Sequence, residues 1–306
     1  MNMQETENRR QKPARVHEPV LMQEVLDALD VQSGEVVLDC TLGGAGHFAK
    51  LYEKLGAGGT IVGLDADPRA LERASAVVAE DPRTKRPQVY LVESNFRYLG
   101  SVLEEHNLAA FDKALFDLGW SSHQLEERRG FSFMKDEPLL MTYGDGGSAA
   151  EIVNSASEQE LADIIFNYGE ERAARRIAKA IVARRARGRI LSTKELVEAI
   201  ESALPRRGKI HPATKTFQAL RIAANDELGA LREGLAAALA KIAAGGRIAV
   251  ISFHSLEDRI VKEIFRDARE RGAGRELSKK PLAPSAAEIA RNPRARSAKL
   301  RVFSHA

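Results

Sequence analysis

The chain has 306 residues, of which 44% are hydrophobic and one, Cys40, is a cysteine. This length suffices for one large domain or for a core domain with a second smaller one. A single cysteine excludes an internal disulfide and a cysteine metal cluster, and fits a reducing cytoplasm. Since no apolar run approaches the roughly 18 residues that cross a bilayer, the composition also excludes a membrane-spanning protein.

The net charge of +3 conceals an uneven distribution of basic residues. Between Arg172 and Lys215 the chain has thirteen Lys or Arg against three Glu, and between Arg259 and Arg301 thirteen against five acids. The remainder is therefore acidic. Two basic zones of this kind indicate a polyanionic partner such as nucleic acid, although solvated helix faces would produce the same pattern.

Apolar spacing predicts the secondary structure in chain order. The polar residues 1–15 are predicted to be a flexible tail, and HEPVLMQEVLDALD that follows has the spacing of a first helix. Helical patterns then alternate with short apolar segments, which indicates a mostly parallel sheet wrapped by helices. The predicted strands lie at 36–38, 61–64, 89–92, 114–118 and 248–253, and KLRVF would form a last strand.

A long helical stretch interrupts this alternation after Leu118. Ser157 with Glu160, and Ser192 with Glu195, fit capping boxes ahead of amphipathic segments. One long helix is expected after HPATKTF, ending at a pair of glycines, 245–246. We therefore predict an α/β domain formed by residues 16–134 and 213–306, with a helical insertion at 135–212.

The segment VVLDCTLGGAGHFAKL, residues 36–51, runs from a strand through three glycines into a helix. Such a turn lets a ligand approach the backbone and directs helix N–H groups at it. Gly44, Gly46 and Ala49 satisfy G-x-G-x-x-G/A. Asp65 follows Gly46 by 19 residues, near the position that holds a ribose in dinucleotide folds. A nicotinamide or flavin enzyme is thus one candidate.

The spacing favours S-adenosylmethionine over a dinucleotide. In a dinucleotide fold the first glycine follows the strand almost at once, whereas residues 39–42 intervene here. Asp39 at the strand end suits a ligand that has an ammonium group and no pyrophosphate. Asp65 would accept the ribose hydroxyls, Phe96 would cover the adenine, and Asp117 would lie at the mouth of the site. Each of these residues alone could instead cap a helix or pack in the core.

Longer motifs carry a resemblance to one family. They are HEPVL, DLGWSSHQLEERRGFSF, GEERAARRIAKAI, HPATKTFQALRIAANDEL, AVISFHSLEDRIVK and NPRARSAKLR. From about residue 17 to 302 the chain resembles the RsmH (MraW) methyltransferases, which methylate N4 of a cytidine in the decoding region of 16S ribosomal RNA. The resemblance implies a Rossmann-like S-adenosylmethionine-dependent methyltransferase fold with a helical insertion domain. It also implies action on the small ribosomal subunit in the cytoplasm.

The resemblance further implies which residues bind the cofactor. They are Ala45, Gly46, His47, Asp65, Phe96, Asp117 and Gln124. Ala45 stands where the family usually has glycine, and is expected to be tolerated if its φ is negative. Trp120 and His123 also depart from the family pattern, as does PLLMTYG at 138–144, where PLDMRMD is common. The last departure leaves open any role of the lost charges.

The chemistry requires an acceptor for the target amine and a support for an extruded base. Asp117 is the predicted catalytic residue, because it could accept the amine N–H groups and stabilise the growing positive charge; it could also act only on the cofactor. Phe131 and Phe133, beside Arg129, could stack on an unstacked base. Both phenylalanines could equally belong to the core of the insertion.

Further residues are expected to meet the RNA or line the site. Arg221 and Asn225 lie one helical turn apart, and Arg294 and Arg296 could hold phosphates without reading sequence. The same phosphate role is expected for Arg172, Arg175, Arg176, Lys179, Lys299 and Arg301, while Ser252 and His254 could line the site. No metal-ligand spacing is evident. Ser255 lacks a G-x-S-x-G elbow and is expected to cap a helix.

Two other functions stay open at this level. One is a nicotinamide-dependent oxidoreductase, and the other is an RNA-binding assembly factor that keeps the cofactor pocket without transferring methyl groups. The sequence determines neither the oligomeric state, for which a homodimer is one option, nor the nucleotide that is methylated.

Overall fold

The computed structural model describes residues 19–119, 128–143, 147–206 and 211–306. Its centre is a seven-stranded sheet in the order β3-β2-β1-β4-β5-β7-β6. The strands are β1 Val36–Asp39, β2 Thr60–Asp65, β3 Gln88–Glu93, β4 Phe111–Asp117, β5 Ile242–Ser252, β6 Gly274–Glu276 and β7 Lys299–His305. The predicted α/β class and the predicted strands are confirmed.

The first five strands run parallel, and β7 lies antiparallel between β5 and β6. The strand order reverses at β1, which pairs with β2 on one side and with β4 on the other. In open parallel sheets this reversal leaves a crevice at the carboxyl ends of the strands, where ligands bind.

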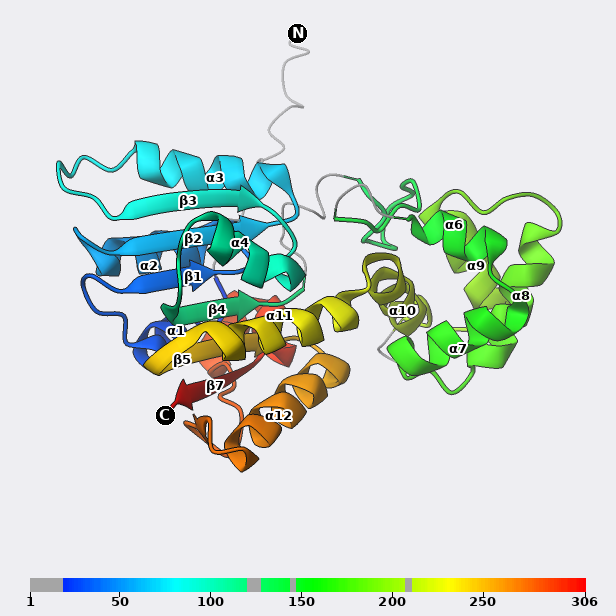
Figure 1. Ribbon diagram of the computed structural model, residues 1–306. Coiled ribbons are helices and arrows are strands. Elements are labelled where there is room, and N and C mark those ends of the chain that lie inside the picture. Colours follow the sequence, from blue (N-terminus) through cyan, green and yellow to red (C-terminus); the bar gives the residue numbers. More distant parts are fainter. Residues whose placement is uncertain (1–18, 120–127, 144–146, 207–210) are drawn as a thin grey trace, which may run out of the picture.

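Helices cover both faces of the sheet (Figure 1). One face packs against α1 Met22–Leu29, α2 Gly46–Leu55, α3 Pro68–Ala79 and the short helix η2 Pro293–Ser297. The helix α13 Ala286–Arg291 precedes η2 in the chain. The other face packs against η1 Phe96–Tyr98, α4 Leu99–Glu105, α11 Glu227–Lys241 and α12 Ser255–Glu270. In α1 the buried residues are Val25, Leu26 and Leu29, so the predicted helical spacing produces one apolar face.

A second group of helices lies to one side of the sheet (Figure 1). It consists of α6 Ala149–Ser155, α7 Glu158–Gly169, α8 Ala174–Arg185, α9 Thr193–Ala203 and α10 Ala213–Asn225. The Ser157 and Ser192 side chains each accept a hydrogen bond from the backbone N–H three residues on, as the capping boxes predict. The group encloses its own core, which runs in sequence from Leu139 to Leu220.

The packing favours a different end for the predicted insertion. Phe217 and Leu220 of α10 belong to the core of the helical group, so α10 packs with the insertion rather than with the sheet. The expected single helix after HPATKTF is wrong, because Asp226 adopts φ 46° and separates α10 from α11. The boundary that the packing supports is therefore at Asp226 and not after residue 212.

The end of α11 also differs from the prediction. The helix stops at Lys241, and Gly245 and Gly246 lie inside β5 instead of ending the helix. The pairing of β5 with β4 shifts register in this stretch, and glycine is common at such irregularities. Among the described residues, no helix is long and apolar enough to cross a membrane.

Candidate active site

A cavity of about 690 Å³ opens where the parallel strands end. Its walls include Thr41 after β1, Asp65 at the end of β2, and Phe96 after β3. Asp117 at the end of β4 and Phe253 after β5 complete this side. The volume lies in the range of about 300–1,000 Å³ that small-molecule and cofactor sites occupy. The predicted convergence of strand-end residues on one site is therefore present in the fold.

The glycine turn contains a strained residue. Ala45 has φ 60° and ψ 14° and caps α2, so the condition under which alanine was expected to be tolerated, a negative φ, is not met. A left-handed conformation costs an L-residue roughly 1–2 kcal/mol, and the buried Ala45 methyl group packs into the core beneath the turn. A side chain at Gly46 would overlap the ring of Pro19. Gly46 is thus needed for close packing of the segment that precedes α1.

Asp65 ties the glycine turn to the end of β2. Its Oδ2 accepts a hydrogen bond from the Gly43 N–H at 2.9 Å, and its Oδ1 accepts one from the Asp67 N–H at 2.9 Å. Burial raises the pKa of Asp65 above its usual value, against the effect of these hydrogen bonds. Each carboxylate oxygen has two lone pairs. Both oxygens therefore keep one acceptor position for a ligand hydroxyl pair at the cavity wall.

Phe96 is held at the cavity wall from two sides. Its ring meets Phe116 edge to face, with centroids 5.6 Å apart. On α11, a Cβ added at Gly234 would lie 2.7 Å from the Phe96 ring. The glycine therefore lets α11 approach the aromatic ring closely, and the ring position depends on that contact.

Asp117 lines the cavity and has one unsatisfied side-chain oxygen. Its backbone N–H donates to Thr41 Oγ1 at 2.7 Å, and its Oδ2 lies 3.4 Å from His47 Nδ1. Its Oδ1 is buried and has no hydrogen-bond partner within the described parts of the chain. Buried polar atoms are rarely left unpaired. This oxygen is therefore placed to accept a hydrogen bond from a ligand.

His47 fixes the position of the Asp117 carboxylate. Its Nε2 lies 3.1 Å from the Val20 carbonyl oxygen and its Nδ1 faces the Asp117 carboxylate, so both ring nitrogens meet acceptors. Only the doubly protonated imidazolium can donate to both. Burial lowers the pKa of His47, but the hydrogen bond and the charge of Asp117 overcome it and raise the pKa above its ordinary value.

Asp39 is behind the cavity wall rather than in it. Its side chain is fully buried, Oδ1 accepts the Thr41 N–H at 3.2 Å, and burial raises its pKa to about 7. The cavity lining includes Thr41 but not Asp39. The expectation that Asp39 meets a ligand ammonium directly is therefore replaced by a role in shaping the turn.

The aromatic residues proposed to support a base pack inside the insertion. Phe131 stacks on Tyr143 with centroids 5.4 Å apart, and Phe133 stacks on His211 at 4.7 Å. Both pack against the core of the helical group, and neither lines the cavity. The geometry favours the core alternative. Arg129 Nη1 donates to the Tyr143 carbonyl at 3.3 Å and so fixes the same segment.

Of the pair expected on one helical face, Asn225 lines the cavity and Arg221 does not. Asn225 Oδ1 accepts the Tyr143 N–H at 3.0 Å, and its Nδ2 donates to the Met141 carbonyl at 2.7 Å. Arg221 is buried, with Nε 2.9 Å from Glu227 Oε1 and Nη2 donating to Oε2 at 2.9 Å. This burial argues against a direct RNA contact by Arg221.

The basic residues near the carboxyl terminus divide into two groups. Arg294 and Arg296 are exposed, and Arg294 lines the cavity mouth. Lys299 and Arg301 instead both pair with Asp258, at 2.9 Å and 2.7 Å. Exposure therefore favours Arg294 and Arg296 as the phosphate-binding candidates.

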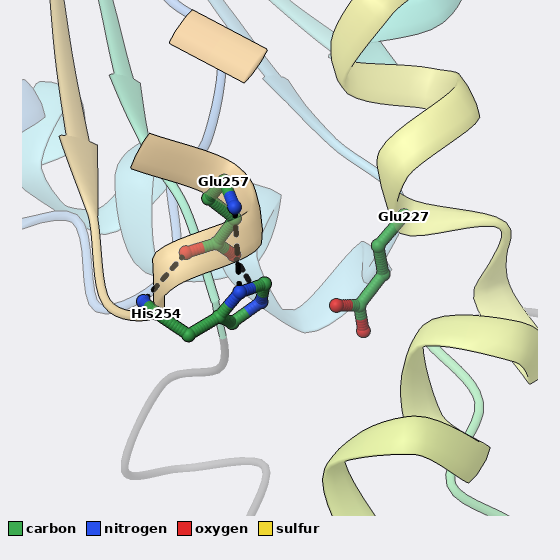
Figure 2. A group of neighbouring side chains, drawn as sticks. All are labelled: Glu227, His254 and Glu257. Carbon is green, nitrogen blue, oxygen red and sulfur yellow. Dashed lines mark hydrogen bonds and ion pairs between the residues drawn. The ribbon is translucent and has the colours of Figure 1, made fainter. Parts of the chain in front are cut away.

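Among the cavity residues that escaped the sequence analysis are Tyr143, Glu227 and Glu257. Figure 2 shows Glu227 projecting from the start of α11 toward Glu257 and His254. His254, rather than the expected Ser255, caps α12, because its side chain accepts the Glu257 N–H. The two glutamates each begin a helix, where acids are common for local reasons, so neither carried a functional signal in the sequence.

The cluster in Figure 2 also has the composition of a cation site. One ligand atom from each of Glu227, His254 and Glu257 lies within 4.8 Å of the others. Arg221 already pairs with Glu227 through two contacts, however, and its fixed positive charge opposes a metal ion beside it. The cluster is better suited to hydrogen bonding than to metal binding.

Some predicted positions lie outside the described residues. Gln124, the remaining cofactor candidate, is one of them, together with Trp120, His123 and Gly144.

Comparison with known proteins agrees with this geometry. The family model described as the MraW methylase family matches residues 14–306. A ribosomal RNA small subunit methyltransferase H of Methylocella silvestris is 48% identical, covering 94% of this chain and 87% of that protein. The proteins of the same name from Heliobacterium mobile and Deinococcus radiodurans are each 46% identical, and cover 94% and 99% of this chain and 97% and 94% of their own length.

The order of the sheet, with its antiparallel last pairings, is that of Rossmann-like S-adenosylmethionine-dependent methyltransferases. The fold, the strand-end cavity and the family match lead to one assignment: the chain belongs to the MraW methylase family.

Proposed function

We propose that this protein methylates N4 of a cytidine in the decoding region of 16S ribosomal RNA, with S-adenosylmethionine as the methyl donor. The observation that carries the proposal is the unpaired Asp117 Oδ1 at the wall of the strand-end cavity. Relatives named as small-subunit ribosomal RNA methyltransferases support the choice of substrate. The proposed site of action is the cytoplasm, because a substrate of this kind is found there.

The cavity residues fit the proposed donor. Asp65 offers two acceptor oxygens for the ribose hydroxyls, and the fixed Phe96 ring offers an apolar surface for the adenine. The turn at Ala45, Gly46 and His47 places the start of α2 at the same cavity, and we propose that Gln124 also contributes. When bound, S-adenosylmethionine supplies an electrophilic methyl carbon on a positively charged sulfur.

Asp117 provides the acceptor that a cytosine amine needs. Its Oδ1 accepts one N–H of the amine and so orients the nitrogen. Its charge stabilises the positive charge that develops on the nitrogen as the carbon–nitrogen bond forms and the methyl–sulfur bond breaks, with S-adenosylhomocysteine as the leaving group. The nitrogen then loses one proton, which Asp117 Oδ1 takes. His47 keeps Oδ2 engaged, so Oδ1 is the carboxylate oxygen that has no hydrogen-bond partner among the described residues.

Exposed basic residues provide the contacts for the RNA backbone. Arg294 and Arg296 lie beside the cavity mouth, and Arg172, Arg175 and Lys179 are exposed at and near the start of α8. Phosphate contacts of this type position a nucleic acid without reading its sequence. In this proposal the two surfaces hold the folded RNA while the target base is turned out into the cavity.

Transfer of tritium from labelled donor to small subunits isolated from cells without this activity tests the proposal. We expect incorporation into the RNA, with N4-methylcytidine as the product identified by mass spectrometry. Calorimetric titration with S-adenosylhomocysteine and NADH in parallel separates a methyltransferase from the oxidoreductase alternative. Donor binding without any transfer would favour the assembly factor instead.

A further inference from the structure

One part of the cavity is not needed for the donor and has its own chemistry. Tyr143, Asn225, Glu227, Phe253 and Glu257 line it, and we call it the acidic subsite. We propose that the acidic subsite recognises the exocyclic amine of the target base, with Glu227 as the acceptor of an amine N–H. This inference rests on the proposed function and adds a base-recognition residue to it.

Glu227 is fixed in one orientation. Arg221 Nη2 donates to Glu227 Oε2 at 2.9 Å, and Arg221 Nε lies 2.9 Å from Oε1 as an ion-pair contact. The Tyr143 hydroxyl donates to Oε1 at 3.1 Å. The Glu227 side chain is 13% exposed and still lines the cavity. Because Arg221 and Tyr143 fix the carboxylate, its remaining lone pairs are available to a ligand in the cavity.

Tyr143, which hydrogen-bonds to Glu227, is itself fixed by a neighbouring side chain. Asn225 fixes the Tyr143 backbone by accepting its N–H at 3.0 Å. Burial raises the pKa of the Tyr143 phenol well above its usual value, helped by the charge of Glu227, so the hydroxyl stays protonated and stays a donor. Tyr143 and Arg221 are therefore positioning residues for Glu227.

The charge balance of the acidic subsite is negative. Glu227 and Glu257 are two carboxylates. Arg221 pairs with Glu227, and His254 Nε2 lies 3.1 Å from Glu257 Oε1. Glu257 Oε2 is satisfied by the Phe253 and His254 backbone N–H groups at 2.7 Å and 3.2 Å. Glu227 is consequently the carboxylate that can still accept a hydrogen bond from a ligand. The negative charge of the acidic subsite favours a ligand group with partial positive charge, such as an N–H donor.

The two pyrimidines differ at the atom that this carboxylate would meet. Cytosine carries an N4 amine, which donates, whereas uracil carries O4, which only accepts. Glutamate accepts hydrogen bonds from cytosine N4 in nucleic-acid complexes, and one good contact of this kind discriminates against the wrong base by about 1–3 kcal/mol, or roughly 5- to 150-fold. The acidic subsite therefore fits cytosine and disfavours uracil.

The test measures base preference apart from methyl transfer. The full-length protein, saturated with S-adenosylhomocysteine, is titrated with cytidine monophosphate and uridine monophosphate by NMR saturation transfer. We expect a roughly tenfold or greater preference for cytidine monophosphate in the wild type. In Glu227→Gln, whose amide keeps the shape but loses the charge, we expect the preference to fall below about threefold. Glu105→Gln, the same change on the exposed face of α4, should behave as the wild type.

Three results would overturn the inference. They are the absence of a preference in the wild type, its retention in Glu227→Gln, and a loss of S-adenosylhomocysteine affinity in that variant as large as its loss of cytidine monophosphate affinity. The last result would assign Glu227 to the donor ammonium. Should Glu227→Gln not fold, Tyr143→Phe replaces it: removal of one anchoring hydrogen bond is expected to reduce the preference partly, and an unchanged preference would contradict the assignment.

The same measurements separate this inference from the proposed function. A wild-type protein that prefers cytidine monophosphate but transfers no methyl group to small subunits would contradict the proposed methyltransferase function. It would still support base recognition by the acidic subsite. If the wild-type protein transfers the methyl group and Glu227→Gln keeps the same preference for cytidine monophosphate, the proposed function is supported. The role of Glu227 in base recognition is then contradicted.

Discussion

Replacement of Asp117 by asparagine separates the two roles that this residue could have. The amide is isosteric with the carboxylate, so the Thr41 hydrogen bond to the backbone and the packing should persist. His47 donates toward Oδ2, so the amide oxygen will take that side. The amide NH₂ then takes the place of the unpaired Oδ1. A donor would face the N–H groups of the target amine.

The expected loss follows from this mismatch. Removing one preorganised electrostatic contact of this kind costs roughly 10²- to 10³-fold in rate, or about 2.7–4 kcal/mol. Stability should change with pH as well. The raised pKa of His47 stabilises the wild type fully below its ordinary pKa of about 6.5, and that stabilisation is lost as pH rises through the raised value. The variant should therefore be more destabilised near pH 6 than near pH 9.

The assay combines single-turnover methyl transfer, titration with S-adenosylhomocysteine, and thermal unfolding at the two pH values. Asp163→Asn, the same change at an exposed site on α7, serves as the control. We expect Asp117→Asn to lose rate with little change in S-adenosylhomocysteine affinity. A rate within about threefold of the wild type, or an affinity loss that accounts for the whole effect, would refute the role on the base and assign Asp117 to the cofactor alone.

Two further changes test the cofactor wall and the RNA surface. Gly234→Ala places a Cβ 2.7 Å from the Phe96 ring and should weaken S-adenosylhomocysteine binding by roughly tenfold, equivalent to 1.4 kcal/mol. Gly100→Ala, whose Cβ meets nothing within 4 Å, should leave binding unchanged and add up to about 1 kcal/mol of helix stability. Charge reversal at Arg294 and Arg296 should weaken RNA binding and flatten its dependence on log salt by about 0.7 for each phosphate that the variant no longer neutralises. An equal loss of S-adenosylhomocysteine affinity would argue against that phosphate role.

The cavity wall could be predicted from sequence because of a property of parallel sheets. Each strand carries its last residue to the same edge, so a local pattern is enough to bring Asp65, Phe96 and Asp117 to one cavity although they are far apart in the chain. The capping boxes at Ser157 and Ser192 are local in the same sense. Features that depend on a few consecutive residues could therefore be predicted from the sequence.

Features that depend on tertiary packing could not be predicted from the sequence. The φ of Ala45 depends on how its methyl group packs beneath the turn, and the side chain itself disfavours that conformation. Phe131 and Phe133 had the composition of a stacking platform, but the core of the insertion offered more apolar contact than the cavity. Arg221 was likewise a plausible surface cation until Glu227 supplied a buried partner.

Glu227 illustrates why the acidic subsite left no trace in the sequence. It begins α11, Arg221 lies in α10, and Tyr143 lies 84 residues earlier in the chain. These groups meet because the left-handed Asp226 turns the chain between the two helices, at the point where the core of the insertion adjoins the sheet domain. Since both residues that anchor Glu227 come from the insertion side, a shift of the insertion would move these anchors while Asp117 stayed with the sheet. Base recognition is then coupled to the position of the insertion, and donor binding is not, so variants at Tyr143 should alter the choice of base before they alter donor binding.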